Sequence, residues 1–276
     1  MNAVIPPLAL NGPTITIRKF SRDPYTDRHL VEFNSISAQM VEYLQCAVLA
    51  RLNILVSGGT GSGKTTMLNV LSSFIPDDER IVTIENAAEL QLQQDHVITL
   101  ETRPPNIENK GEVTIRDLVI NSLRMRPDRI IVGEVRGGEA FDMLQAMNTG
   151  HDGSLTTLHS NSAKDAVSRL ETMVLMAGME LPARAVHEQI SSAIHVIIQQ
   201  ERMRDGTRKV TSITEVDGVD EHGIKLREMY KYQQTGFEDG KLKGRFTASG
   251  QQSSYYDEML DSGAPVSEEL FQPSVA

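Results

Sequence analysis

The sequence predicts an α/β fold whose central sheet is mostly parallel and carries a small antiparallel β extension. From about Leu52 onward, short runs rich in Ile and Val alternate with longer segments of helical spacing, which is typical of βαβ units. Beyond His195 the pattern changes to alternating segments joined by turns that contain Gly206 and Gly223, which indicates antiparallel strands. A chain of 276 residues, 39% of them hydrophobic, can bury one sizeable core with a smaller appendage.

Each expected element follows from its local spacing. The strands of the parallel part are predicted at four short apolar runs, 53–58, 80–85, 129–134 and 154–159. Helices with apolar residues three and four positions apart are predicted at 64–74, 114–125, 138–148 and 163–176, and another helix opens at Pro182. The antiparallel strands are expected at 195–203, 207–216 and 223–232. The head of the chain carries a possible strand at 14–20 and an apolar helix at 38–50.

Composition narrows the classes of function. The net charge of -10 argues against a sequence-independent grip on nucleic acid, because such a grip needs clustered Lys and Arg along the phosphates. Cys46 is the single cysteine, which excludes an intrachain disulfide and a Cys-based zinc site and suits a reducing compartment. We expect no signal peptide and no transmembrane segment, hence a cytoplasmic protein or one attached to a membrane through partners.

The stretch SGGTGSGKTTML, residues 57–68, contains the pattern GxxxxGK[ST]. It follows an apolar strand and opens a helix, and in that context loop amides and the helix N-terminus point at an anion. The pattern predicts a P-loop, in which Lys64 reaches the β- and γ-phosphates of a nucleotide and Thr65 places its hydroxyl on Mg²⁺. The expected binding residues are Gly58, Gly59, Thr60, Gly61, Ser62, Gly63, Lys64, Thr65 and Thr66. Binding alone would suit a kinase, a GTPase, a helicase or a motor.

The ends of the other strands discriminate among these classes. Three predicted strands end in Glu85, Glu134 and His159, and ligands of open α/β sheets lie outside the carboxyl ends of the strands. This set suits hydrolysis, because one carboxylate can organise Mg²⁺ while the other orients and deprotonates water. His159 could sense the γ-phosphate or donate a hydrogen bond to it. His151 is the weaker candidate, since a His beside Gly and Asp is common in turns.

An arginine could neutralise the charge that grows during phosphoryl transfer, often from a neighbouring subunit. The candidates are Arg103, Arg124, Arg126 and Arg136, and spacing does not decide among them. We take Arg124 as the candidate catalytic arginine.

Four blocks in order, GGTGSGKTT, RIVTIENAAEL, RIIVGEVRGGEA and TGHDGSLTTLHSN, carry a resemblance to a known family. Together they resemble the secretion ATPases that power type II and type IV secretion and pilus assembly. The resemblance extends to the strands near Tyr232 and implies a RecA-like P-loop NTPase core. The stretches 100–119 and 142–154 are most similar to the tight-adherence (Tad/Flp) pilus branch, with conjugation-type relatives close behind.

The resemblance implies a role for individual residues. Glu85 would be the base toward water, Glu134 would support the metal, and His151 and His159 would couple the nucleotide state to domain movement. Arg18 matches an arginine of the segment that links two domains, expected near the nucleotide. The family works as hexameric rings on an inner-membrane platform protein. The resemblance therefore implies a homo-oligomer with ATP and Mg²⁺, peripheral to the inner membrane, that converts ATP hydrolysis into domain motion.

Two features depart from the family pattern. Asn86 follows Glu85 where relatives commonly have an acid, and the chain begins too late to contain a full N-terminal domain. We expect a remnant of that domain and its linker at 1–50 and a RecA-like ATPase domain at 51–200. A C-terminal antiparallel extension at 201–250 and a flexible acidic tail at 251–276 are expected to follow.

Two other functions stay open. The chain could be a regulatory module that binds nucleotide without driving work, because its N-terminal domain is largely missing. It could also be a DNA translocase or helicase, which the acidic balance disfavours. The guanine signature NKxD does not occur, so a GTPase is not expected.

Overall fold

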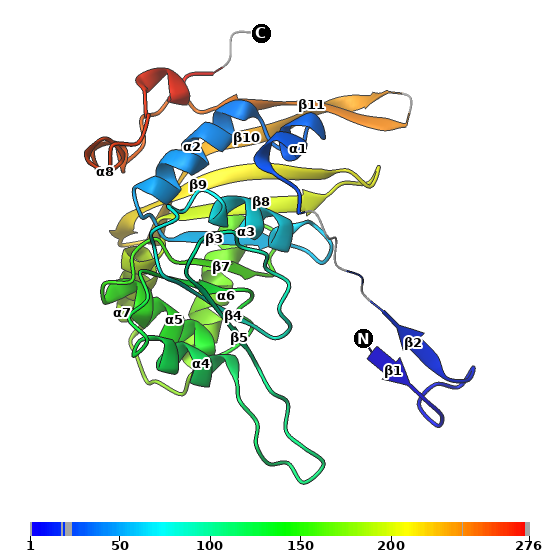
Figure 1. Cartoon of the computed structure of the whole chain (residues 1–276). Coiled ribbons are helices and arrows are strands. Elements are labelled where there is room, and N and C mark those ends of the chain that lie inside the picture. The colour runs from blue at the N-terminus through cyan, green and yellow to red at the C-terminus, as the bar shows by residue number, and fades with distance from the viewer. Residues whose placement is uncertain (1, 18, 20–23, 239, 274–276) are drawn as a thin grey trace.

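A single large sheet organises the molecule (Figure 1). The structure is a computed structural model that describes residues 2–17, 19, 24–238 and 240–273. Within these residues, nine strands form one sheet in the order β11-β10-β9-β8-β3-β7-β6-β4-β5. The predicted α/β fold, with a mostly parallel centre and an antiparallel part, is confirmed.

The parallel part contains the strands that lead to the predicted site. Its members are β3 (Ile54–Gly58), β4 (Ile81–Glu85), β5 (Val97–Glu101), β6 (Arg129–Val132), β7 (Leu155–Leu158) and β8 (Val196–Arg202). Strands β3, β4, β6 and β7 are buried along their whole length, which explains their uninterrupted Ile and Val runs. Strand β5 was not predicted, because half-burial at the edge of the sheet leaves it with a mixed sequence.

The antiparallel part continues the same sheet. Strands β9 (Arg208–Asp220), β10 (Gly223–Glu238) and β11 (Lys241–Ala248) follow β8 as a meander. Strand β8 pairs in parallel with β3 and antiparallel with β9, so it joins the two parts. The expected boundary between 200 and 201 falls inside β8. The division of the chain into an ATPase domain and a C-terminal extension therefore stays a prediction.

Helices cover both faces of the sheet and define two hydrophobic cores. One core contains residues of α2 (Ala38–Leu49) and α3 (Lys64–Ser72). The other contains residues of α4 (Ile115–Ser122), α5 (Glu139–Asn148), α6 (Ala163–Met176) and α7 (Ala183–Ala193). Along β3, Ile54 and Val56 belong to the first core and Leu55 to the second, as the alternation of side chains in a strand requires.

The head of the chain forms a small separate ribbon. Strands β1 (Asn2–Val4) and β2 (Thr14–Thr16) pair antiparallel, and Figure 1 shows them projecting away from the main sheet. The predicted strand at 14–20 thus ends at Thr16 within the described residues. Helix α1 (Asp27–Glu32) follows. Arg18 lies outside the described residues.

The expected flexible tail is wrong for residues 251–273. This segment contains α8 (Tyr256–Asp261) and a 3₁₀ helix, η1 (Glu268–Phe271). Phe271 is 1% exposed, and the Tyr230 hydroxyl donates to the Leu270 carbonyl over 2.6 Å. The polar composition of the tail hid a few well-spaced apolar residues, Met259 among them, that bury in the core with α2.

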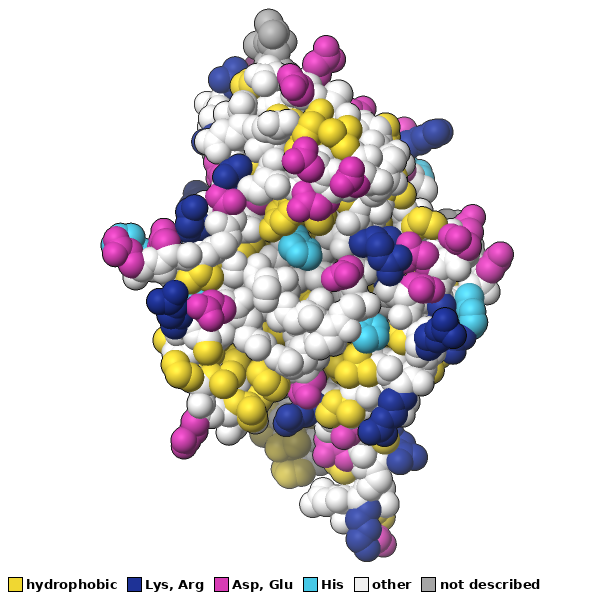
Figure 2. Space-filling model, turned by 90° about the vertical axis from the view of Figure 1, so that its left-hand side faces the viewer, with side chains coloured by type: hydrophobic (Ala, Val, Ile, Leu, Met, Phe, Trp, Pro, Cys, Tyr) yellow, Lys and Arg dark blue, Asp and Glu magenta, His cyan; other side chains and the backbone are white. Residues whose placement is uncertain are grey.

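Surface charge on the side of the molecule away from the P-loop is mixed. Figure 2 shows acidic and basic side chains interspersed on this face, with hydrophobic side chains between them. Among the described residues, no helix has both the length and the apolar character needed to cross a bilayer.

Candidate functional site

The P-loop connects β3 to α3 in a conformation that depends on glycine. Gly63 precedes α3 with φ of 104°, a backbone conformation that residues with a Cβ adopt only with strain. Gly58 lies against β8, where an added Cβ would sit 2.2 Å from the Gln200 carbonyl oxygen. The loop can therefore turn tightly into the N-terminus of α3, whose free amides favour an anion.

Lys64 is the first residue of α3, and its side chain points back toward the start of the P-loop. Its Nζ donates to the carbonyl oxygens of Gly58 and Gly59 over 3.0 and 3.2 Å. The residue is 9% exposed, and burial lowers the pKa of its ammonium, while the nearby Glu134 acts in the opposite direction. The positive charge is therefore held beside the loop with little water around it, where its attraction to phosphate is strong.

A polar chain runs from Lys64 to the ends of β6 and β7. Lys64 Nζ lies 3.3 Å from His159 Nδ1, and His159 Nε2 lies 2.6 Å from Glu134 Oε1. The other Glu134 oxygen accepts from Arg136, over 2.9 Å from Nε and 2.5 Å from Nη2. Burial and the Lys64 charge lower the pKa of His159. A neutral imidazole fits both contacts, because its Nε2 can carry the proton that faces the Glu134 carboxylate while Nδ1 is free to accept from Lys64.

Glu85, the last residue of β4, is buried and held by the backbone. Its side chain lies against Gly133, and its Oε1 accepts from the amides of Glu89 and Leu90 over 3.0 and 3.2 Å. The residue is only 4% exposed. Burial raises the pKa of its carboxyl, although the two amide bonds act in the opposite direction. A buried carboxylate of raised pKa is a suitable proton acceptor.

One cavity of about 670 Å³ brings most of the predicted residues together. It is lined by Thr60, Gly61, Gly63, Lys64, Thr65 and Thr66 of the P-loop region and by Glu85, Glu134 and His159. Gly58, Gly59 and Ser62 shape the loop without lining the cavity. Sequence reasoning missed other lining residues, including Tyr25, Phe33, Gln200, Thr207 and Arg208.

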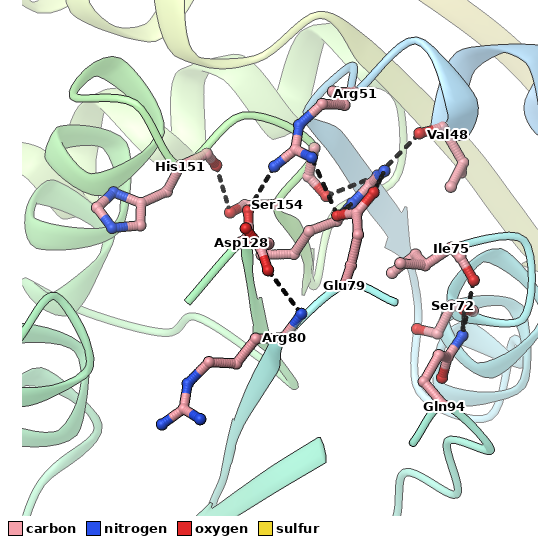
Figure 3. A network of polar contacts seen from close by, with 12 residues as sticks. Val48, Arg51, Ser72, Ile75, Glu79, Arg80, Gln94, Asp128, His151 and Ser154 are labelled. Atoms are coloured by element: carbon pink, nitrogen blue, oxygen red, sulfur yellow. Dashed lines mark hydrogen bonds and ion pairs between the residues drawn. The ribbon is translucent and has the colours of Figure 1, made fainter. Parts of the chain in front are cut away.

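His151 and Arg124 lie at the opposite edge of the sheet, which corrects their assignment to this site. His151 precedes β7 whereas His159 follows it, so the strand separates the two imidazoles. The His151 carbonyl accepts from Ser154 Oγ over 2.7 Å, near a network of Arg51, Glu79 and Asp128 (Figure 3). Arg124 is exposed after α4, before β6 begins. Neither residue lines the cavity.

The residues at the cavity fit a magnesium ion bound together with phosphate. Mg²⁺ takes one or two protein oxygens and completes its shell with phosphate oxygens and waters. The Thr65 hydroxyl and the Glu134 carboxylate supply such oxygens at the cavity wall. Within the described part of the chain, no group of three or more His, Cys, Asp or Glu could hold a metal by itself.

The raised pKa of Glu85 predicts a pH-dependent difference in stability. Because the folded carboxyl binds its proton more tightly than the unfolded one, stability falls as pH rises from about 4.5 through the raised pKa. Glu85→Gln carries no ionisable group there, so its stability relative to the native chain is expected to increase from acid to neutral pH. Urea unfolding at a series of pH values measures this difference. The exposed Glu112→Gln is the control, and a constant difference for Glu85→Gln would contradict the argument.

The comparisons with known proteins agree with this geometry. The family described as "Type II/IV secretion system protein" matches residues 3–247. The chain belongs to this family. A putative conjugal transfer protein of Mycobacterium tuberculosis is 40% identical over 213 residues, covering 77% of this chain and 60% of the relative. The conjugal transfer protein TrbB of Rhizobium radiobacter is 36% identical, covering 78% of this chain and 64% of the relative.

Among solved structures, the VirB11 ATPase of the Brucella suis type IV secretion system is similar to this family member. The two are 32% identical with a TM-score of 0.59, over 68% of this chain and 55% of VirB11. The ATPase DotB of Yersinia pseudotuberculosis, 21% identical with a TM-score of 0.51, shares the fold. The chain spans less than two thirds of the length of these relatives.

Proposed function

We propose that this protein is an ATP-hydrolysing motor of a type II or type IV secretion or pilus assembly system. The observation that carries the proposal is the single cavity in which the P-loop, two carboxylates and an imidazole meet. A P-loop alone would support binding. The added carboxylates supply what hydrolysis needs, namely an acceptor for the proton of the attacking water and a ligand for the metal.

Each residue has a chemical role in this proposal. Lys64 and the amides at the start of α3 bind the phosphates, and Thr65 and Glu134 hold Mg²⁺, which neutralises charge on the phosphate oxygens when bound. Glu85 accepts a proton as water attacks the γ-phosphorus, and the bond to the β-γ bridging oxygen breaks to leave ADP and phosphate. His159 contacts both Lys64 and Glu134. It therefore connects the phosphate-binding lysine to the metal-binding carboxylate when the γ-phosphate is bound.

The assembly context is proposed from the relatives. Conjugal transfer and type IV secretion proteins are similar to this chain. This similarity supports a homo-oligomer that works on an inner-membrane platform protein, and the family resemblance implies that the oligomer is a hexamer. The tight-adherence branch is proposed from the amino-acid sequence of residues 100–119 and 142–154. In a ring, Arg124 and His151 lie at an edge from which they could reach a neighbouring copy rather than their own cavity, and Arg18 is proposed near the nucleotide. We place the protein in the cytoplasm, peripheral to the inner membrane.

The proposal is tested by the ATPase rate per molecule as protein concentration rises, with molecular size measured in the same solutions. We expect the rate to increase together with the appearance of an oligomer. Bound ATP without turnover at any concentration would favour the binding-only module instead. Stimulation of hydrolysis by single-stranded DNA would favour a translocase.

A further inference from the structure

The hairpin between β8 and β9 brings an arginine directly onto the P-loop. Arg208 begins β9, and its Nε donates to the Gly61 carbonyl oxygen over 2.9 Å. The side chain also passes Gly63, where an added Cβ would lie 3.4 Å from Arg208 Cδ. Arg208 and its neighbour Thr207 line the cavity. The antiparallel part of the sheet therefore contributes to the nucleotide site.

The guanidinium of Arg208 keeps donors available for a ligand. It carries five N–H donors in a planar fork, of which the contact with Gly61 uses one. Within the described residues, its Nη1 and Nη2 make no hydrogen bond or ion pair with the protein. A fork held by one nitrogen at the wall of a cavity is oriented to donate two hydrogen bonds to an oxyanion.

The turn that carries Arg208 is itself fixed. Asp205 Oδ1 accepts from the backbone N and the hydroxyl of Thr207, over 3.0 and 2.7 Å. Its Oδ2 accepts from the backbone N of Leu242 in β11 over 2.9 Å. These bonds lower the pKa of Asp205 to about 2, so the carboxylate stays ionised at working pH. The hairpin is thus held in place, and Arg208 loses little conformational freedom on binding a ligand.

The strand order shows which part of a nucleotide Arg208 faces. The P-loop follows β3, which lies between β7 and β8. His159 and Glu134 follow β7 and β6, and Glu85 ends β4, all on one side of β3. Gln200 and Arg208 belong to β8 and β9 on the other side. The transferred γ-phosphate belongs on the side of the acids. With the γ-phosphate there, we expect the α- and β-phosphates and the ribose to extend toward β8 and β9.

The aromatic residues of the cavity support the same orientation. Tyr25 and Phe33 line the cavity with rings 5.4 Å apart, and both are about half exposed. Their segment packs on the antiparallel part, because Val210 N of β9 donates to the Ser35 carbonyl over 2.8 Å. Exposed aromatic rings suit stacking on a base. We therefore expect the base and the non-transferred phosphates on the Arg208 side.

We infer that Arg208 is a nucleotide-binding residue. Its Nε holds the P-loop through the Gly61 carbonyl, and the N–H groups of Nη1 and Nη2 donate to the α- or β-phosphate. This inference rests on the proposed function, since it takes a nucleoside phosphate as the ligand. It differs from that function in one respect: the residue contributes affinity for both ADP and ATP and takes no part in the chemical step.

The test compares Arg208→Ala with Arg204→Ala, an exposed arginine of the same hairpin that does not line the cavity. We expect Arg208→Ala to weaken ADP and ATP equally, by about 10-fold, as the loss of a charged hydrogen bond implies. KM should rise in proportion while kcat stays within about twofold. Arg208→Lys keeps the positive charge without the fork, so its nucleotide affinities should lie between those of the native chain and those of Arg208→Ala. Arg204→Ala should bind both nucleotides like the native chain.

The possible results separate this inference from the proposed function. Unchanged affinity for ADP in Arg208→Ala, weakened ATP binding with native ADP binding, or lost kcat at native KM would each overturn the inference. Native protein that binds ADP but never hydrolyses ATP would overturn the motor, while the ADP affinities would still decide the role of Arg208. A melting temperature equal to that of the native chain shows that Arg208→Ala is folded.

Discussion

Lys64→Ala is expected to weaken ATP binding by at least about 100-fold, because the variant loses charged hydrogen bonds to phosphate in a partly desolvated site. Lys64 is 9% exposed and its ammonium already donates to two loop carbonyls, so the charge is positioned before a nucleotide arrives. The free energy of unfolding should not fall, because the substitution removes a buried ammonium group. Burial disfavours the charged form of this group and lowers its pKa. Isothermal titration with ATP, together with thermal unfolding, measures both quantities.

Lys164→Ala is the matched control for this variant. Lys164 is exposed on α6 and does not line the cavity. It should bind ATP like the native chain. If Lys64→Ala retained native affinity in a folded state, the P-loop would not be the phosphate site, and the proposed role of the cavity would be wrong.

The core of the site could be predicted from sequence because it depends on local rules. The GxxxxGK[ST] spacing fixes a loop between a strand and a helix, and the carboxyl ends of parallel strands lie at one edge of a sheet. These two rules were enough to place Lys64, Glu85, Glu134 and His159 around a common cavity. Strand β6 itself ends at Val132, so Glu134 enters the cavity from the turn that follows it.

The residues that sequence reasoning missed reach the cavity through long-range pairing. Arg208 and Gln200 depend on the register of β9 on β8 and of β8 on β3, which no local pattern specifies. Tyr25 and Phe33 depend on the docking of the segment around Ser35 on β9. The sequence predicts the strands that carry Gln200 and Arg208 but no element at Tyr25 and Phe33, and the side of the sheet that all four approach is a tertiary property.

His151 is the opposite case, because the family resemblance predicts a role at the nucleotide site that a local rule contradicts. A residue before a strand and a residue after it lie at opposite edges of the sheet, separated by about 13 Å for the four residues of β7. The rule alone therefore places His151 away from His159. Arg124 precedes β6 in the same way. Neither residue therefore lies beside the cavity of its own chain.

Glu134→Gln is expected to lower turnover by at least about 100-fold while ATP affinity stays within a few-fold of the native value. The amide keeps the size of the side chain but removes the charge that would hold Mg²⁺ beside the γ-phosphate, whereas the binding contacts of Lys64 remain. Single-turnover hydrolysis and equilibrium binding of ATP separate the two effects.

The control is Glu171→Gln, which alters a Glu–His pair of the same kind at a distance from the P-loop. Glu171 Oε1 lies 3.1 Å from His187 Nε2, and neither residue lines the cavity. This variant should hydrolyse ATP normally. A second readout is the titration of His159, because the Glu134 charge raises the pKa of this imidazole against the effects of burial and Lys64. Its pKa should therefore fall further in Glu134→Gln, and native turnover with an unchanged His159 titration would remove Glu134 from the mechanism.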